Sequence, residues 1–452
     1  MASQHRRILT TLTATAALAA LGLLTACSGG SAGTGDTGEF GFSAPEQKAD
    51  SSITVWVDAA REPLAKAFVT ANPDTPVKIE TYDGNSGGSD SFKTKMALFD
   101  QSGSGWPDVV FSTQTNDASW ASKETNGTQA FAAPLNKGLL DDSFLDGFTA
   151  GANDPMTLDD TVYGLRNDLA PVVLWYNQKL LTEFGYEAPT TWQDYEALSD
   201  KLAAEHPGYI LGSVGDSFAG TYIYYWGAQA PIFQLDGDTF TSDFSDKHTT
   251  EMTKLLDHMV ANGTLVQDSV FSADFVSKYA DKLVGVPGPV WYTGAIFQGG
   301  LKTPAGQIGV APALKWDGGE VAAGNVGGGE WYASSHSKNL DAVKTFLEFV
   351  TSADEFQVDA SSGYPAYTTV ASKWLDKQAE AKYFVNDDFT TVMTDAATQI
   401  WDGWNVTSWS PETAWAKIVI PGIAADKTVE SLLPEWQKEL ENEATVNGYT
   451  VK

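Results

Sequence analysis

The feature that most constrains the fold is an alternation of strand and helix patterns in residues 52–112. Ile53–Val57 is a β-branched, apolar run that predicts a strand, and Val77–Tyr82 and Asp108–Ser112 predict two more. The apolar residues between them recur at helical spacing, and Pro63 lies where a first helical turn tolerates proline. The order strand, helix, strand, helix, strand implies a parallel sheet and an α/β fold.

The rest of the chain continues this mixture of elements. Leu169–Asn177 and Ile308–Ala313 predict further strands, and amphipathic helical patterns follow Thr190, where Gln193 completes a capping box. Trp56 lies in a strand and Trp192 on the apolar face of a helix. We therefore predict that both are core residues, whereas other aromatic residues lie in stretches rich in Gly, Pro, Asn and Ser.

Composition excludes several classes of function. The chain has 58 acidic and 28 basic residues, a formal net charge of −30, which repels phosphate backbones, so we expect no nucleic-acid partner. A single cysteine allows neither a disulfide nor a thiolate zinc site. The sequence has no H-E-x-x-H motif, Walker loop or histidine cluster, and we expect no metal or cofactor.

The N-terminus carries the pattern of an export signal. Arg6 and Arg7 precede the uncharged, apolar run Ile8–Leu23. The order Leu24, Thr25, Ala26, Cys27 resembles the lipobox of bacterial lipoproteins. That resemblance implies cleavage before Cys27, a diacylglyceryl group on its sulfur, and a protein tethered to the extracellular face of the cell membrane. The alternative is an ordinary secretion signal in which Cys27 is incidental.

A series of short motifs extends from residue 52 to residue 440. They are Ile53-Thr54-Val55-Trp56, Pro107-Asp108-Val109-Val110, Tyr163-Gly164-Leu165, Leu174-Trp175-Tyr176-Asn177, Pro189-Thr190-Thr191-Trp192, Gly327-Gly328-Gly329, Ser337-Lys338-Asn339 and Gly363-Tyr364-Pro365-Ala366. In this order and spacing they resemble the sugar- and oligosaccharide-binding family of extracellular solute-binding proteins of ABC importers. Arg166 departs from the family pattern, in which proline more often follows the Tyr-Gly-Leu triplet.

The resemblance implies a two-lobe α/β fold, similar to that of periplasmic binding proteins, with a ligand cleft between the lobes. It predicts a monomeric, lipid-anchored protein that captures a carbohydrate, most simply an oligosaccharide, and delivers it to permease subunits in the membrane without covalent chemistry. The expected division is a signal peptide at 1–26, a lipidated flexible spacer at 27–50, lobe 1 at 51–167 and 310–361, and lobe 2 at 168–309 and 362–452.

Candidate ligand-binding residues combine aromatic platforms with polar partners, because a sugar ring has apolar faces edged by hydroxyl groups. In an open α/β sheet, ligands lie beyond the carboxyl ends of the strands, so the loops after Val57, Tyr82 and Ser112 should face the cleft. The alternative for the aromatic residues is the core, and for the acidic residues a solvated surface. The candidates are Trp226, Trp291, Trp331, Tyr364 and Trp404; Gly328 and Gly329 before Trp331; and Asp58, Asp83, Asn85, Gln114, Arg166, Asp168 and Glu330.

Two other classes of function stay open. Gly84–Gly88 matches the G-x-S-x-G elbow of serine hydrolases, with Ser86 as nucleophile, and a glycosidase would need only two carboxylates. Against an esterase, the last of the five histidines is His336, and no spacing supports a catalytic triad. A non-sugar solute, such as a polyamine or a peptide drawn by the negative charge, is the other alternative.

Overall fold

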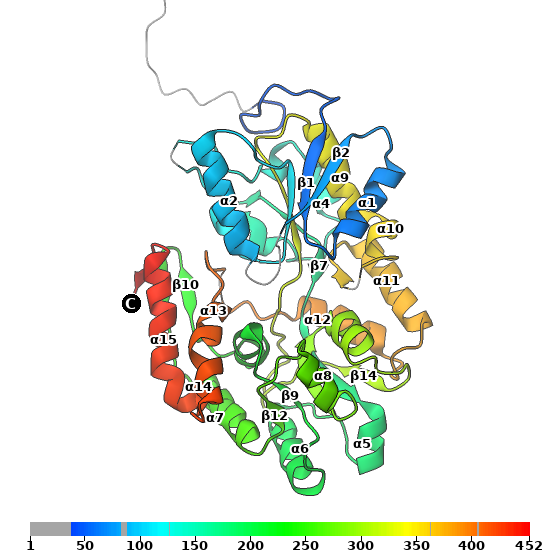
Figure 1. The fold of residues 1–452 in the computed structure, drawn as a ribbon, viewed down its shortest axis with the longest axis vertical. Helices are drawn as coiled ribbons and strands as arrows, with labels where there is room; N and C mark the ends of the chain where they lie inside the picture. The colour runs from blue at the N-terminus through cyan, green and yellow to red at the C-terminus, as the bar shows by residue number, and fades with distance from the viewer. Residues whose placement is uncertain (1–37, 83–87, 126, 362, 405) are drawn as a thin grey trace, which may run out of the picture. The chain divides into compact units, whose positions relative to one another are not determined.

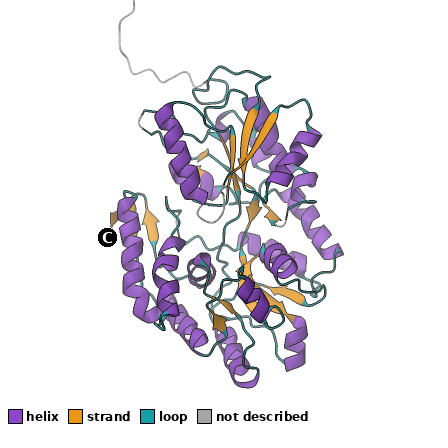
Figure 2. Ribbon diagram, viewed as in Figure 1, coloured by secondary structure: helices purple, strands orange, loops and turns teal. Residues whose placement is uncertain are grey.

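Two lobes, each built around β-strands, are joined by a few crossing segments (Figure 1). The computed structural model describes residues 38–82, 88–125, 127–361, 363–404 and 406–452. Helices cover the strands of both lobes, as Figure 2 shows. The predicted two-lobe α/β architecture is confirmed.

The first lobe has a five-stranded sheet in the order β2-β1-β3-β15-β6. β1 pairs in parallel with β2 and β3, as the alternation of strands and helices predicts. β15 returns from far along the chain and pairs antiparallel with β3 and β6. The strands are β1 (Ile53–Val57), β2 (Val77–Thr81), β3 (Val109–Ser112), β6 (Leu165–Arg166) and β15 (Glu330–Ala333), with a hairpin of β4 (Thr157–Leu158) and β5 (Thr161–Val162) beside them.

Alternate residues of the central strands enter two different cores, because successive side chains of a strand point to opposite faces. Val55 joins the larger core with Phe68 and Phe346, on the face covered by α1 and α9. Trp56 joins a smaller core with Phe92, on the face covered by α2. The helices of this lobe are α1 (Glu62–Ala71), α2 (Gly88–Ser102), α3 (Ala118–Ala121), α4 (Asp142–Leu145), α9 (Leu340–Ser352) and α10 (Asp354–Gln357), with 3₁₀ turns η1 (Leu135–Lys137) and η2 (Asp154–Met156).

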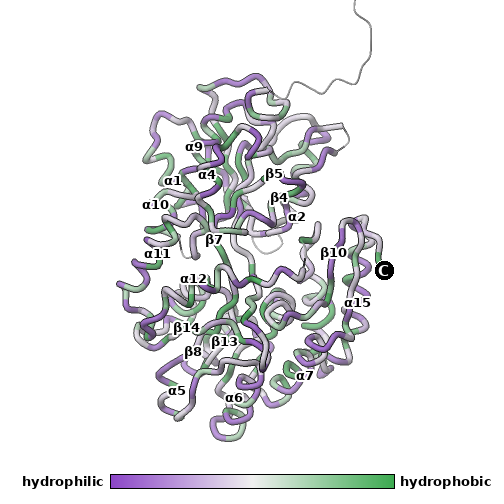
Figure 3. Tube along the Cα trace, turned by 180° about the vertical axis from the view of Figure 1, so that it is seen from behind, coloured by the Kyte–Doolittle hydropathy of each residue, from purple (hydrophilic) through white to green (hydrophobic). Residues whose placement is uncertain are grey.

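The second lobe is centred on β8 (Val172–Asn177), which pairs antiparallel with β13 (Gly285–Pro289) and β14 (Ile308–Ala311). In Figure 3 the hydrophobic colour of this lobe lies on the inner strands β8 and β14, and the hydrophilic colour is frequent on the helices around them. Smaller sheets surround them: β9 (Gly212–Ser213) with β12 (Leu265–Val266), and β10 (Gln234–Asp236) with β11 (Thr239–Thr241) and β17 (Thr450–Val451).

The helices of the second lobe enclose these sheets. Thr191, not the predicted Thr190, caps α6, since its hydroxyl accepts from the main-chain N–H of Asp194. Trp192, at the start of α6, is buried as predicted. No helix in the described ranges is long and apolar enough to cross a bilayer. The helices are α5 (Gln178–Phe184), α6 (Trp192–Glu205), α7 (Lys247–Ala261), α8 (Ala273–Tyr279), α11 (Thr368–Glu380), α12 (Phe389–Thr398), α13 (Glu412–Ala414), α14 (Ile420–Ala424), α15 (Val429–Val446) and the π-helical turns η3 (Ala219–Tyr225), η4 (Thr293–Gly300) and η5 (Trp415–Val419).

The segment before β1 packs on the first lobe. The prediction of a flexible spacer is therefore wrong for its described part, residues 38–50. Phe42 is buried in the larger core, and the side chain of Gln47 accepts a hydrogen bond from the main-chain N–H of Leu340 at 2.9 Å. The amide of Asn339 donates to the main chain of the same segment. The glycine-rich composition of this segment predicted flexibility, but the buried side chain of Phe42 holds it on the lobe.

The chain returns to the first lobe later than the predicted boundary at residue 310. That residue lies in β14, which pairs with β8 of the second lobe, and the first sheet is rejoined only at β15. Between the lobes, β7 (Asp168–Leu169) pairs antiparallel with β16 (Tyr364–Pro365). These crossing segments bring Asp168 to the junction of the lobes.

Candidate ligand-binding cleft

A cavity of about 740 Å³ lies between the lobes, and we call it the main cavity. The first lobe contributes the residues that follow β1 and β3, as the rule on strand ends predicts. The second lobe contributes residues at the starts of η3, η4 and α13, and Phe271 shortly before α8. Its walls include Asp58, Arg61, Thr113, Gln114, Thr115, Asp168, Phe218, Tyr222, Phe271, Trp291, Gly327, Gly328, Gly329, Gly363 and Glu412.

Asp58 organises the first-lobe wall by holding Arg61. Its carboxylate accepts from the main-chain N–H of Arg61 at 2.8 Å and pairs with the guanidinium at 3.0 Å. The guanidinium lies 4.7 Å from the centre of the Phe111 ring. Since Asp58 is already paired, Arg61 is the charged donor that this wall presents, and sequence analysis missed it.

Gln114 joins the two lobes across the main cavity. Its side-chain oxygen accepts a hydrogen bond from the hydroxyl of Ser410 at 2.9 Å. Ser410 lies two residues before Glu412, the first residue of α13, so this contact links the polar groups of the two walls.

The glycines before β15 are required by their close approach to Arg166 and Phe111. Gly328 has a φ of 86°, and a Cβ added there would meet a guanidinium nitrogen of Arg166 at 2.3 Å. A Cβ on Gly329 would meet the ring of Phe111 at 2.1 Å. The main chain of this segment therefore forms cavity wall where a side chain would not fit. The carboxylate of Asp168 holds it by accepting from the N–H of Gly329 at 2.9 Å.

Arg166 and Glu330 form an ion pair beneath this glycine segment, 3.1 Å apart and both buried. The other guanidinium nitrogens of Arg166 donate to the main-chain oxygens of Asp168 and Gly327, at 2.8 and 2.6 Å. Burial raises the pKa of the Glu330 carboxyl, while Arg166 and the hydroxyl of Tyr332 lower it. The predicted ligand contact Glu330 does not line the main cavity; its partner is Arg166.

Replacing Arg166 by methionine should lower the free energy of unfolding by about 3–5 kcal/mol, because Glu330 would stay buried without a counter-charge. Urea denaturation measures this difference. Lys373→Met is the matched control, since Lys373 pairs with Asp354 at the surface, and its loss should cost no more than about 1 kcal/mol. Equal losses in the two variants would contradict the structural role of Arg166.

Aromatic rings form the second-lobe wall. Phe271 lies nearly parallel to Trp291, with centroids 6.0 Å apart and planes at 16°, and Phe218 meets Trp291 edge-on at 5.9 Å. The indole N–H of Trp291 donates to the main-chain oxygen of Val326 at 2.8 Å. Phe271 is 54% exposed, which is unusual for so large an apolar side chain. This wall offers ring faces of the kind that stack on sugars.

Glu412 provides a carboxyl group within the same wall. It is only 7% exposed, and burial raises the pKa of its carboxyl to about 7, partly offset by a hydrogen bond from Ser217 and reinforced by the charge of Asp216. Tyr222, at the same wall, also has its pKa raised, first by burial and then by Glu412. Near neutral pH, Glu412 can therefore act either as a hydrogen-bond donor or as an acceptor.

The raised pKa of Glu412 predicts a pH-dependent stability. The neutral carboxyl group is favoured in the folded state, so its contribution to stability is complete below pH 4.5, the ordinary pKa of a glutamate. That contribution, at most about 3 kcal/mol in the free energy of unfolding, is lost as the pH rises through about 7. Glu412→Gln cannot ionise and removes that loss. The melting temperature of the variant minus that of the wild type should therefore increase between pH 5 and pH 8. Thermal unfolding measures this. The exposed Glu183→Gln is the control, and an unchanged difference between Glu412→Gln and wild type would contradict the assignment.

A second cavity of about 430 Å³, which we call the tryptophan pocket, also lies between the lobes. Its walls include three indole rings, those of Trp226, Trp401 and Trp404. Trp226 and Trp404 lie 5.1 Å apart, and the indole N–H of Trp226 donates to the main-chain oxygen of Trp401 at 2.7 Å. Arg166 also contributes to this wall.

The structure separates the predicted site residues into four groups. Asp58, Gln114, Asp168, Trp291, Gly328 and Gly329 line the main cavity, whereas Arg166, Trp226 and Trp404 line the tryptophan pocket. Glu330, Trp331 and Tyr364 line neither cavity. Asp83 and Asn85, predicted to follow the second strand, lie outside the described residues, as do Ser86 and Cys27.

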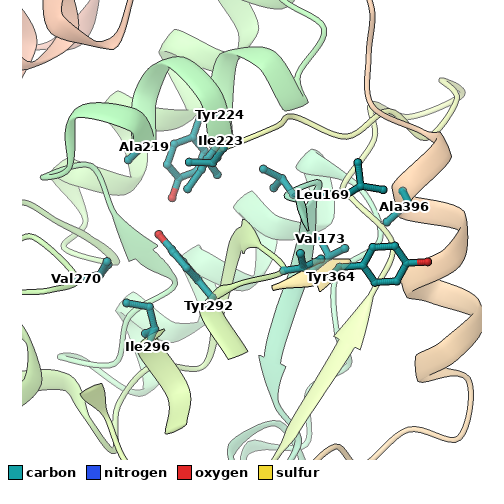
Figure 4. Close-up of a cluster of buried hydrophobic side chains, with 14 of the residues drawn as sticks. Leu169, Val173, Ala219, Ile223, Tyr224, Val270, Tyr292, Ile296, Tyr364 and Ala396 are labelled. Carbon is teal, nitrogen blue, oxygen red and sulfur yellow. The ribbon is translucent and has the colours of Figure 1, made fainter. Parts of the chain in front are cut away.

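Two of the predicted platforms are core residues. Trp331 is fully buried and packs edge-on against Phe111 at 4.9 Å, because it lies on the face of β15 that α9 covers. Tyr364 packs edge-on against Trp374 at 5.8 Å and lies beside Ala396 in a buried cluster (Figure 4). The burial of Trp331 and Tyr364 therefore favours the core, which was the alternative for the aromatic candidates.

Sequence analysis missed Arg61, Phe218, Phe271, Tyr222, Trp401 and Glu412. The sequence does mark Phe271 in one way. It is a large apolar residue in a short loop between Ser269 and Ser272, outside any helical or strand pattern that would predict its burial. Glu412 gave none, since a chain with 58 acidic residues offers no way to single it out.

Residues 50–355 match the bacterial extracellular solute-binding protein family, which is more than half of the chain. The chain belongs to this family. No curated protein matches it in sequence. The family assignment confirms the resemblance found in the sequence, and it places the protein among extracellular binding proteins.

Solved structures of solute-binding proteins share the fold at low sequence identity. The galacto-N-biose/lacto-N-biose I-binding protein of a Bifidobacterium longum ABC transporter has a TM-score of 0.71 and 18% identity, covering 90% of this chain and all of its own. The binding protein of B. animalis subsp. lactis, solved with β-1,6-galactobiose, has a TM-score of 0.71 and 20% identity, covering 89% and 99%. The GacH receptor of Streptomyces glaucescens, solved with and without acarbose, has a TM-score of 0.66 and 19% identity, covering 89% and 100%.

Proposed function

We propose that this solute-binding protein captures an oligosaccharide in the main cavity and delivers it to the permease of an ABC importer. The observation that carries the proposal is the pairing of an aromatic wall, formed by Phe271 and Trp291, with a polar wall that presents Arg61 and the glycine main chain. A sugar needs both, because its ring faces are apolar and its edges are hydroxyl groups. The structural neighbours that bind sugars support the same ligand class.

The arrangement captures a ligand without altering it. Glu412 can accept or donate hydrogen bonds, Asp168 accepts them and Arg61 donates them, while the rings exclude water from the apolar faces. The four described histidines, His206, His248, His258 and His336, lie in the walls of neither cavity, which gives a serine nucleophile no base there. In the described part of the chain, no three His, Cys, Asp or Glu residues group as metal ligands. The family of this chain is one of binding proteins, and we therefore favour binding over hydrolysis, whether by a serine or by two carboxylates.

The alternative of a non-sugar solute keeps one observation in its favour. The carboxyl groups of Asp168 and Glu412 have no cationic partner among the ion pairs of the described residues, and they would attract an amine. Isothermal titration with oligosaccharides of two to six units, and separately with polyamines, distinguishes a sugar ligand from an amine ligand. Heat with a sugar and none with spermidine supports the proposal, and the reverse result overturns it.

Phe271→Ala should weaken sugar binding by about tenfold, because the exposed ring faces the main cavity and its stacking area is lost. Titration calorimetry measures the change in Kd. Leu98→Ala is the matched control, since Leu98 is 58% exposed on α2 and lines neither cavity. Both variants should melt within about 2 °C of the wild type, and a normal Kd for Phe271→Ala would remove the aromatic wall from the site.

We further propose that Cys27 carries a diacylglyceryl anchor that keeps the receptor beside its permease. Two acyl chains hold a protein on a bilayer, whereas one chain binds it only marginally. Cys27→Ala should move the protein from the membrane fraction to the medium of intact cells, as measured by immunoblotting. Ser28→Ala is the control, and a Cys27→Ala protein that stays fully membrane-bound would refute the anchor.

A further inference from the structure

The second-lobe wall of the main cavity holds two buried carboxyl groups without a cationic partner. Glu412 lines the cavity, and Asp216 lies close enough to act on it electrostatically. They are 7% and 8% exposed, and neither belongs to an ion pair in the described part of the chain. The hydroxyl of Ser217 donates to Glu412. The hydroxyl of Ser269 and the main-chain N–H of Val270 donate to Asp216 at 2.5 and 3.0 Å. Only neutral groups therefore compensate the two carboxyls.

The facing wall does not supply the missing positive charge. Among the described residues that line the main cavity, Arg61 is the one cation, and Asp58 neutralises it at 3.0 Å. Asp168 adds a further carboxylate, only 4% exposed. Its Oδ1 accepts from the main-chain N–H of Gly329, whereas its Oδ2 accepts no hydrogen bond from any described residue. The balance of charge in the cavity is therefore negative, with Asp168 and Glu412 in excess.

Aromatic rings surround the carboxyl group of Glu412. Its donor Ser217 immediately precedes Phe218, whose ring meets that of Trp291 edge-on at 5.9 Å. Tyr222 follows one helical turn later on η3, and the charge of Glu412 contributes to the raised pKa of its hydroxyl, after burial. The face of an aromatic ring attracts a cation, and a carboxylate beside it strengthens that attraction. Rings and a carboxyl group together suit an ammonium group better than a hydroxyl group.

Resting on the proposed function, we infer that the ligand of the main cavity is an amino sugar, in which at least one ring carries a protonated amine, and that the amine lies between Glu412 and the aromatic wall. An uncharged sugar would leave the carboxyl groups of Asp168 and Glu412 without a counter-charge, which is unfavourable for buried groups. A linear polyamine would leave the donor Arg61 and the exposed ring of Phe271 without the hydroxyl groups and the ring face that they fit.

Calorimetry with sugars that differ at one substituent tests the inference. The probes are β-1,4-linked glucose, glucosamine and N-acetylglucosamine oligosaccharides of two to four units, with the matched monosaccharides of the gluco, galacto and manno series. In each series that binds, the amine should bind about tenfold more tightly than the hydroxyl compound, and the N-acetyl compound, which has no charge, should lose that gain.

Three results overturn the inference in different ways. Equal affinity for the amine and the hydroxyl compound, or for the amine and the N-acetyl compound, overturns the amino-sugar ligand and leaves the proposed function standing. If no sugar of any kind binds, the proposed function fails, and the amino-sugar ligand fails with it.

Glu412→Gln keeps the shape of the side chain and removes its charge. The preference for the amine, measured as the ratio of the two Kd values, should fall from about ten to about one in this variant. Glu183→Gln is the matched control, because Glu183 is exposed on α5 and lines neither cavity, and its ratio should stay at the wild-type value. An unchanged ratio in Glu412→Gln overturns the placement of the amine.

Proton release by the wild type gives a readout that no misfolded variant can imitate. The groups around the Glu412 carboxyl are Asp216 and Tyr222 in its own wall, and Asp168 and Arg61 in the facing wall. With its pKa at about 7, Glu412 is about half protonated at pH 7, and an ammonium group bound beside it lowers that pKa. Binding of the amine should therefore release about half a proton at pH 7, after subtraction of the proton exchange of the amine itself.

Calorimetry in two buffers of different ionisation enthalpy measures that release. The hydroxyl compound should release less, because it brings no charge to Glu412. Equal release with the amine and the hydroxyl compound, or none with the amine, overturns the inference.

Discussion

The buried ion pair of Arg166 and Glu330 is the interaction on which the rest of the site depends. One guanidinium group binds the carboxylate of β15 and the main-chain oxygens of Asp168 and Gly327, so it ties the first sheet to two crossing segments. A charge removed from water is tolerated only when its hydrogen bonds are complete, and Arg166 meets that condition. The position is the one where the family more often has proline, which could make none of these bonds.

The ion pair of Arg166 and Glu330 contributes to the walls of both cavities. Gly328 passes so close to the guanidinium group that a side chain would not fit, and main chain becomes cavity wall. Arg166 itself faces the tryptophan pocket, while the glycine segment and Asp168 face the main cavity. Arg61 and Phe271 then present a charged donor and a ring face to the main cavity.

How far the sequence could predict the site depended on periodicity. The strand ends after β1 and β3 were placed correctly, because β-branched runs and helical spacing mark the elements and the topology then fixes which end faces the ligand. Trp331 was misplaced because it follows the glycine segment, yet it lies in β15, where alternation turns its ring toward α9 and the core. Phe271 and Glu412 lie in segments without a period, so no pattern distinguished them.

The sequence by itself determined the α/β class and the strand ends that face the cleft, since these depend on local patterns of apolar residues and on topology. The two lobes and the family came from the resemblance of its short motifs to those of a known family. Tertiary structure alone decided which aromatic residues are core and which are cavity wall, and that Arg166 braces the glycine segment. The physical reason is that burial and ion pairing depend on residues such as Glu330, which lies 164 positions away in the chain from Arg166. No pattern within one segment carries that information.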